Sequence, residues 1–292
     1  MDATVVTQVV ASGIATGSIY SLIAISLIII YNATRTINFA QGELLMISTF
    51  VGYTAYTMMG LPLPVALLGA VLGGAVLAFL VERLIIRHAI GATHFDVLII
   101  TFGLALVLQS VAGLVWTHDE FPFPSLFAGD PVALGPVRIA RDSLGVIGAS
   151  LALMLALYLL FGFTRLGRAM RAVSQNQRAA SLMGISVERI YTAAWVLAAV
   201  VSAVAGFLVA PVIFLSSKMG LIVINGFIAA ILGGFGSLPG AVIGGMALGV
   251  IENLAPLYLP SEIRYSVPFL LLIAILVVRP SGLLGVARQR RV

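Results

Sequence analysis

The stretch RLGRAMRAVSQNQRAASLMGISVERI, residues 165–190, decides how the chain must be arranged, because it is the one long polar segment in an otherwise apolar sequence. An arginine at the centre of an inserted helix costs about 2.5–3.5 kcal/mol. The segment must therefore lie outside the bilayer core. Its alanines, Leu182 and Met183 favour helix, and Gly184 predicts a stop. It carries five basic residues: Arg165, Arg168, Arg171, Arg178 and Arg189.

Charge alone leaves two interpretations of this segment open. One is a solvated loop, whose arginines serve only to orient the chain in the membrane. The other is a cytoplasmic helical hairpin against which another protein docks. Charge by itself favours the solvated loop.

The composition of the whole chain indicates a membrane protein. Of its 292 residues, 61% are hydrophobic and 9% are charged, whereas about a quarter of the residues in soluble domains are charged. At about 20 residues per span, about eight to ten helices fit, and no soluble domain does. The net charge of +5 resides in short polar connections, so it predicts membrane orientation and no nucleic-acid partner.

Nine apolar runs predict membrane-spanning helices, and the last three are interrupted by Gly and Pro. The predicted fold is therefore an all-α polytopic membrane protein, a bundle of about eight or nine transmembrane helices. The runs lie at about 9–31, 39–58, 62–82, 97–116, 144–163, 191–214, 221–235, 241–257 and 265–279.

Basic residues distinguish the two sides of the membrane. If all nine runs cross, four basic residues lie on one side, Arg138, Arg141, Lys218 and Arg264, and twelve lie on the other. The side richer in arginine is assigned to the cytoplasm. The N-terminus, with Asp2, is then outside, the C-terminus is inside, and residues 117–142 form an acidic external loop. The twelve are Arg35, Arg83, Arg87, the five of residues 165–190, Arg279, Arg288, Arg290 and Arg291.

Glycine has two predicted roles. Small residues spaced four apart let helix backbones approach closely in lipid, although glycine is also common in membrane helices generally. Irregular backbone within a bilayer is tolerated only where protein buries it or water lines it, so residues 31–43 (YNATRTINFAQGE) and 233–240 (GGFGSLPG) are candidate walls of a pathway. The spaced pairs are Gly13/Gly17, Gly69/Gly73, Gly240/Gly244 and Gly245/Gly249.

The residues required for membrane enzymes are missing from the spans. His88, His94 and His118 lie in or beside loops, no H-E-x-x-H motif occurs, and every aspartate lies outside a span or at its edge. The chain has no cysteine, and its only lysine, Lys218, is not part of a P-loop. We expect no enzyme activity, metal or cofactor, which leaves passage of a solute or a scaffold.

Four stretches resemble the membrane permeases of bacterial branched-chain amino acid ABC importers, and more closely the first of their two permease types. The resemblance covers essentially the whole chain, so residues 1–292 are expected to form a single permease domain in the bacterial inner membrane. It implies a second permease as heterodimer partner, two cytoplasmic ATPase subunits that bind the ATP, and a periplasmic substrate-binding protein. The stretches are 17–47, which contains NFAQGE, 167–185, 233–252, which contains GGFGSLPG, and 279–285 (RPSGLLG).

The resemblance also assigns residues 172–186 to a coupling helix that docks on an ATPase. The usual signature is E-A-A followed by three residues and Gly. Ala179, Ala180 and Gly184 match it, whereas Arg178 replaces the Glu, and Ala194 stands where an Ile is expected. The small residues would let a partner surface approach, and Arg168, Arg171 and Arg178 would add charge-assisted contacts.

Polar residues within spans are the candidates for the substrate path, because ionisable side chains in lipid are by default functional hypotheses. Glu43 and Glu252 could equally cap helices or bond neighbouring backbone. The function expected from the resemblance is import of branched-chain or related amino acids. Alternatives are a urea or short-amide permease of the same family, a self-contained channel or ion-coupled carrier, and a structural scaffold. The candidate path residues are Asn38, Gln41, Glu43, Asn225, Glu252 and Asn253.

Overall fold

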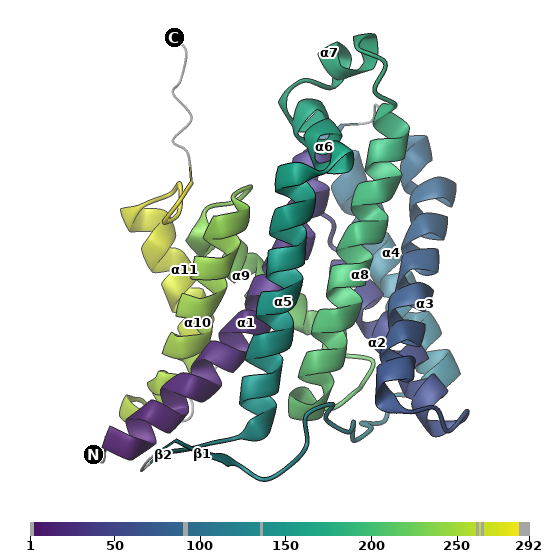
Figure 1. Ribbon diagram of the computed structural model, residues 1–292. Coiled ribbons are helices and arrows are strands. Elements are labelled where there is room, and N and C mark those ends of the chain that lie inside the picture. The colour runs from purple at the N-terminus through teal and green to yellow at the C-terminus, as the bar shows by residue number, and fades with distance from the viewer. Residues whose placement is uncertain (1–2, 90–92, 135–136, 261–262, 264–265, 286–292) are drawn as a thin grey trace. The chain divides into compact units, whose positions relative to one another are not determined.

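The computed structural model describes residues 3–89, 93–134, 137–260, 263 and 266–285 (Figure 1). Arg264, Arg288, Arg290 and Arg291, which entered the count of basic residues, lie outside these residues, and so does Asp2. The described helices are α1 (Ala3–Thr34), α2 (Gln41–Thr57), α3 (Leu63–Leu84), η1 (Ile86–Ala89), α4 (His94–Trp116), α5 (Arg141–Phe163), α6 (Arg165–Gln175), α7 (Gln177–Leu182), α8 (Val187–Ile213), η2 (Met219–Ile222), α9 (Val223–Gly233), α10 (Leu238–Tyr258) and α11 (Val267–Val278).

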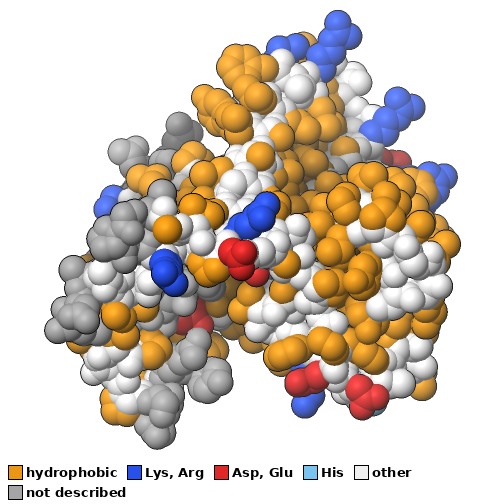
Figure 2. All heavy atoms as spheres, turned by 60° about the horizontal axis from the view of Figure 1, so that its bottom comes forward, with side chains coloured by type: hydrophobic (Ala, Val, Ile, Leu, Met, Phe, Trp, Pro, Cys, Tyr) orange, Lys and Arg blue, Asp and Glu red, His pale blue; other side chains and the backbone are white. Residues whose placement is uncertain are grey.

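The nine apolar runs all fall on helices, which confirms an all-helical polytopic membrane protein. Six helices, α1, α3, α4, α5, α8 and α10, are long and apolar enough to cross a bilayer, and Met219–Gly233 and α11 are shorter apolar helices. Many large hydrophobic side chains of α3, α4 and α5 are exposed, as lipid contact requires. Figure 2 shows hydrophobic side chains among polar and charged ones on the face drawn. The loop 117–142 also contains a short antiparallel ribbon, β1 (Val132–Leu134) and β2 (Val137–Ile139), which the sequence did not predict.

The chain divides into two compact units. The first unit comprises residues 1–28, 127–151 and 223–292, and the second comprises residues 29–126 and 152–222. Helices α1 and α5 each contribute to both units, and each unit is described by itself.

In the first unit, α1 and α10 approach each other through glycine, as the four-residue spacing predicted. A Cβ added to Gly13 would lie 2.8 Å from Cα of Val250, and one added to Gly17 would lie 2.7 Å from Cα of Met246. On α10, a Cβ at Gly249 would collide with the backbone of Gly17. The pairs Gly13/Gly17 and Gly245/Gly249 therefore form one helix contact with no space for a side chain.

The opposite pair on α10, Gly240/Gly244, packs against α9. A Cβ at Gly244 would collide with the carbonyl of Ala229, and one at Gly240 with the carbonyl of Gly233. Helix α10 thus presents two glycine faces, one to each neighbouring helix. Ser237 begins α10, because its hydroxyl accepts a hydrogen bond from the Gly240 amide at 3.1 Å.

The GGFGSLPG stretch is the turn between α9 and α10, and the terminal RPSGLLG stretch packs on it. The amides of Leu283 and Leu284 donate to the carbonyls of Leu232 at 2.9 Å and Gly233 at 2.8 Å. Gly234 has a φ of 109° and faces the backbone of Gly285, where a side chain would not fit. Close backbone contact therefore accounts for these glycines, and a pathway wall at 233–240 is not needed to explain them.

The second unit is centred on α8, which packs against α2 and α3. Trp195, Phe207 and Phe50 are among its largest fully buried side chains. Small residues again allow the contact, since a Cβ at Gly206 of α8 would collide with the hydroxyl of Thr49. Of the predicted pair Gly69/Gly73, Gly73 packs tightly on Val51, whereas Gly69 makes only an ordinary contact.

Contacts join connections of the second unit at two places. At one end, Arg35 bonds Ser174 of α6, and Arg87 pairs with Glu188 of α8. At the other end, the backbone groups of Phe121 and Leu215 exchange hydrogen bonds. Aromatic rings pack on one another near that second contact: Phe50, Tyr53, Trp116, Phe121, Phe123 and Phe207.

The glycine contact between α1 and α10 predicts that Gly249→Ala is destabilising. The added methyl group meets backbone, which cannot move aside, so we expect a loss of about 1–3 kcal/mol in the free energy of unfolding. The matched control is Gly148→Ala, because Gly148 is also helical and nothing lies within 4 Å of its added Cβ. That variant should be neutral or up to about 1 kcal/mol more stable. Unfolding of the purified chain in mixed micelles measures both, and equal stability of the two variants would contradict the packing described here.

Candidate functional site

A buried amide pair links the start of α2 to the middle of α8 in the second unit. Asn38 donates from Nδ2 to Oε1 of Gln41 at 2.9 Å, and its Oδ1 accepts from the Ala40 amide at 3.0 Å. Gln41 in turn donates from Nε2 to the Ser202 hydroxyl at 2.7 Å and to the Ala198 carbonyl at 3.2 Å. Asn38, Gln41 and Ser202 are all buried. The NFAQGE stretch is thus fixed on α8 by hydrogen bonds that have no competition from water.

Ser202 was missed at the sequence level, although the sequence contains a signal for it. It is the one polar side chain in the eighteen residues of α8 that follow Trp195. A hydroxyl in such a run needs a hydrogen-bond acceptor or donor nearby, because an unsatisfied polar group in hydrocarbon is costly.

Glu43 lies on the same first turn of α2 as Gln41 and faces a different partner. It is buried, its Oε2 makes no hydrogen bond within the described residues, and a Cβ at Gly220 would lie 2.6 Å from its Oε1. Gly220 belongs to η2 and is itself buried. The carboxylate sits in the first turn of α2, where the helix dipole favours negative charge. Glu43 is thus a buried acid with an oxygen available for a cation.

The segment 215–222 brings η2 to Glu43. Leu215 is bridged to Phe121 at the aromatic end of the unit, and Ser217 accepts from Gln109 at 3.1 Å through its carbonyl. Thr54 marks that same end of α2, since it accepts from Trp116 at 2.8 Å. Glu43 lies about 16 Å further along the helix axis. The segment therefore runs inward along α2 as a turn followed by the short helix η2, a course that the sequence pattern did not predict.

The other three candidate path residues belong to the first unit and have separate partners. Asn225 of α9 donates to the Tyr20 hydroxyl of α1 at 2.9 Å. Asn253 donates to the Gly249 carbonyl of its own helix at 2.9 Å. Glu252 is half-buried on α10. Asn38 and Gln41 thus bond each other, whereas Asn225 and Asn253 each bond a different residue.

Segment 165–190 forms the hairpin that the sequence predicted, with a capping side chain at each break. Thr164 caps α6 by accepting from Gly167 at 3.1 Å, and Ser186 caps α8 by accepting from Arg189 at 3.5 Å. Asn176 ends α6 and begins α7, where its Oδ1 accepts from the Ala179 amide at 3.0 Å. Gly184, at a φ of 80°, stops α7 as predicted, and the Ile185 amide bonds back to Ala180 at 3.1 Å.

The hairpin has a buried face and an exposed face. Gly167, Met170, Val173 and Ala180 are buried, so Ala180 packs within this chain instead of offering itself to a partner. Leu182 and Met183, which sequence reasoning counted only as helix formers, are each 83% exposed at the tip. Large apolar side chains exposed on a polar segment are characteristic of a protein interface. The other predicted docking residues are also exposed: Arg168, Arg171, Arg178, Ala179 and Gly184.

Two arginines fasten the hairpin to neighbouring backbone. Arg171 donates to the carbonyl of Phe161, and Arg35, in the turn after α1, donates to the carbonyl of Ser174. Arg35 has a φ of 61°, which costs a side-chain-bearing residue about 1–2 kcal/mol. The bond to Ser174 and the stacking on the Tyr31 ring at 5.9 Å offset that strain. Arg171 therefore holds the hairpin in place rather than projecting freely.

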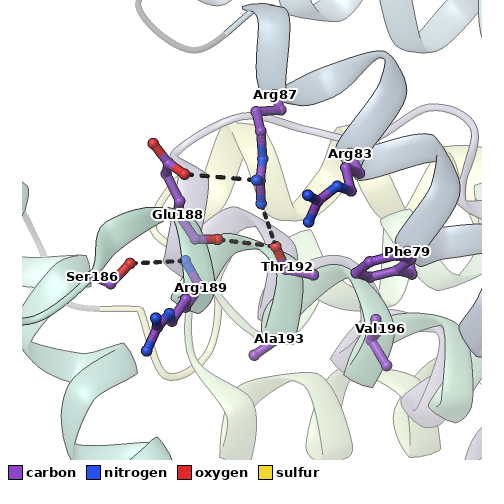
Figure 3. Close-up of a pocket in the computed structure, with 9 residues that line it drawn as sticks. All are labelled: Phe79, Arg83, Arg87, Ser186, Glu188, Arg189, Thr192, Ala193 and Val196. Atoms are coloured by element: carbon purple, nitrogen blue, oxygen red, sulfur yellow. Dashed lines mark hydrogen bonds and ion pairs between the residues drawn. The ribbon is translucent and has the colours of Figure 1, made fainter.

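A buried acid joins α3 to the start of α8. Glu82 is fully buried, accepts from the Thr192 hydroxyl at 2.7 Å and pairs with Arg87 at 3.4 Å. Arg87 also donates to Thr192 at 3.0 Å and pairs with Glu188 at 3.6 Å (Figure 3). The sequence identified Arg87 only as an orienting charge and overlooked Glu82. These contacts involve the first turns of α8, the helix that follows α7 in the chain.

Asp96, near the start of α4, serves as a cap. Asp96 and Thr93 form a reciprocal capping box at the start of α4, with hydrogen bonds of 2.9 and 3.3 Å. Among the residues that the structure describes, no three His, Cys, Asp or Glu side chains gather as metal ligands would. The candidate residues within the described ranges are therefore buried polar groups on one hand and an exposed hairpin surface on the other.

Comparison with known proteins gives one consistent result. The family model described as "Branched-chain amino acid transport system / permease component" matches residues 9–276. The high-affinity branched-chain amino acid transport system permease protein LivH is 34% identical over 293 residues in both Salmonella typhimurium and Escherichia coli K12, covering 95% of each chain. The permease protein BraD of Pseudomonas aeruginosa is 32% identical over 292 residues, again covering 95% of each chain.

The amide network predicts that Gln41→Leu destabilises the second unit. Leucine fills a similar volume but leaves the Asn38 amide without its acceptor in a buried place, so we expect a loss of about 1–3 kcal/mol in the free energy of unfolding. The same substitution at the exposed Gln175 should change it by less than about 0.5 kcal/mol. Unfolding in mixed micelles distinguishes them. A Gln41→Leu variant as stable as the Gln175→Leu variant would remove the structural role assigned to this network.

Proposed function

Because the chain belongs to the family of branched-chain amino acid transport system permease components, we propose that it is the membrane subunit of an ATP-driven importer. The importer takes branched-chain or related amino acids from a periplasmic binding protein and passes them through this subunit. The observation that carries the proposal is the family match over residues 9–276. The apolar helices and the polar groups buried between them are consistent with passage of a small polar solute.

The subunit lies in the inner membrane with eight or nine spans, and both compact units form one permease domain. Its N-terminus is outside, and the hairpin 165–190 and the C-terminus are cytoplasmic. The twelve-to-four distribution of basic residues supports this orientation. The grouping of Arg35, Arg87 and the hairpin at one end of the second unit agrees with it.

The functional assembly contains a second permease, two ATPases and the binding protein, and the hairpin is the surface on which an ATPase docks. Leu182 and Met183 form the apolar centre of that surface, and Arg168 and Arg178 form its charged rim. Gly184 and Ala180 shape the turn that presents them. Movement of the ATPase is passed to α8 through Ser186, and to α3 through Glu188 and Arg87.

The substrate path in the second unit passes Glu43. Its unpaired carboxylate oxygen can accept hydrogen bonds from the ammonium group of an amino acid, and residues 215–222, which include η2, supply the opposite wall. Asn38 and Gln41 support this wall through their bonds to α8. Asn225, Glu252 and Asn253 are assigned to the part of the path in the first unit.

Docking through the apolar tip predicts that the double variant Leu182→Ala, Met183→Ala takes up leucine about tenfold more slowly. Loss of roughly 1.4 kcal/mol at a buried interface corresponds to that factor. The assay is ATP-driven uptake in proteoliposomes that contain both permeases, the ATPases and the loaded binding protein. Liposomes with this chain alone should show no uptake.

The matched control is Met58→Ala, Met59→Ala, because these side chains are 79% and 69% exposed in the connection between α2 and α3. That variant should transport normally. An equal loss of uptake in both double variants would show that the effect is not specific to the hairpin tip, and would contradict docking there. Uptake by the chain alone would overturn the proposed function itself and favour a channel or carrier.

The orientation predicts which introduced cysteine is reached from outside the cell. The chain has no cysteine of its own, so Ala128→Cys in the external loop and Ala179→Cys in the hairpin give clean single sites, both exposed. A membrane-impermeant maleimide added to spheroplasts should label only the first. Permeabilised spheroplasts should label both. Labelling of Ala179→Cys from outside would reverse the assigned topology.

A further inference from the structure

A basic pocket lies where α3 meets the start of α8, away from the proposed path. Its volume is about 580 Å³, within the usual range of small-molecule sites. Figure 3 shows residues from the last turns of α3, from η1 and from the first turns of α8 around it. The lining residues include Phe79, Arg83, Arg87, Glu188 and Arg189.

Two of the three arginines in this pocket lack an acidic partner. Arg87 is matched by Glu82 and Glu188 at 3.4 and 3.6 Å. Within the described residues, neither Arg83 nor Arg189 forms an ion pair, and both are exposed. They approach the pocket from different helices and together carry two unmatched positive charges. Such a pair suits a phosphate or carboxylate, since guanidinium groups bind these anions through paired hydrogen bonds.

An exposed apolar stripe on α3 leads directly to the pocket. Its side chains succeed one another at three- and four-residue spacing, so they share a helix face. The stripe ends at Phe79, whose ring lies 5.8 Å beneath the guanidinium of Arg83. An arginine at the end of such a stripe lies at the border between hydrocarbon and headgroups. The stripe comprises Leu68, Leu72, Val76 and Phe79, all exposed.

We propose that this pocket binds the phosphate of an anionic phospholipid, with Arg83 and Arg189 on the headgroup and an acyl chain along the stripe of α3. A free anion would use the arginines and leave the stripe without a role, whereas a phospholipid accounts for both. The predicted orientation is consistent with this proposal, because the distribution of basic residues assigns Arg83 and Arg189 to the cytoplasmic leaflet. Basic pockets between spans on that side are known to hold anionic headgroups. The inference depends on the membrane location and not on the transported substrate.

Native mass spectrometry of the full chain released from nanodiscs tests this site. The nanodiscs contain phosphatidylglycerol and phosphatidylcholine with identical acyl chains in equal amounts. The native chain should retain phosphatidylglycerol preferentially, and Arg83→Gln, Arg189→Gln should lower the ratio of the two retained lipids about tenfold. Arg83→Lys, Arg189→Lys, which keeps both charges, should retain most of the preference. Arg165→Gln is the control, because Arg165 is an exposed arginine on the same hairpin that does not line the pocket.

Three outcomes would overturn the proposal. The first is an equal lipid ratio in the native chain and in the double glutamine variant. The second is complete displacement of the retained lipid by excess inorganic phosphate, which would assign the pocket to a free anion. The third is loss of ATPase association in that variant with an unchanged lipid ratio, which would assign the arginines to a protein partner. The single variant Arg189→Gln changes only one exposed side chain. Its ratio of retained phosphatidylglycerol to phosphatidylcholine should fall about threefold. The test therefore does not depend on whether the double variant folds.

Discussion

The structure depends on one constraint: polar groups placed in hydrocarbon must find their partners inside the protein, because no water is there to supply them. Backbone groups meet this requirement within helices, and glycine then lets the helices pack, as at Gly17 and Gly249. Side chains meet it in pairs, as Gln41 does with Ser202. Close packing and hydrogen bonding are therefore two consequences of the same absence of water.

The same constraint explains what could be predicted from the sequence. Apolar runs, the basic hairpin and the glycine pair of α1 are local patterns with a fixed physical meaning, so they indicated the helices, the hairpin and one helix contact. Pairings between distant residues carry no such pattern. The bonds of Gln41 to α8, the burial of Glu82 and the packing of residues 279–285 on α9 follow from tertiary contact. The inward course of residues 215–222 was hidden because that stretch reads as a short polar connection.

The hairpin has one face that packs against this chain and a tip that is exposed. Its first helix turns Met170 and Val173 toward this chain, and its tip turns Leu182 and Met183 outward. Capping side chains at each break let the backbone change direction without leaving amides unsatisfied. Sequence reasoning predicted that the segment is helical and identified its charges, but it could not distinguish which of the small and apolar residues face inward. That distinction depends on the register of the short helices against α8.

Helix α8 connects the parts of the second unit that a transport cycle would have to coordinate. It begins immediately after the hairpin, meets α3 at Thr192 and holds the start of α2 at Ala198 and Ser202. Ser186 and Ser202 are about 24 Å apart along the axis, and a helix of that length moves nearly as a rigid body. The amide of Gln41 bonds α8 at two points one turn apart, so the start of α2 must follow a tilt of α8 or lose both bonds together. Since Glu43 lies on that same turn of α2, the geometry gives a displacement of the hairpin a direct physical route to the buried carboxylate.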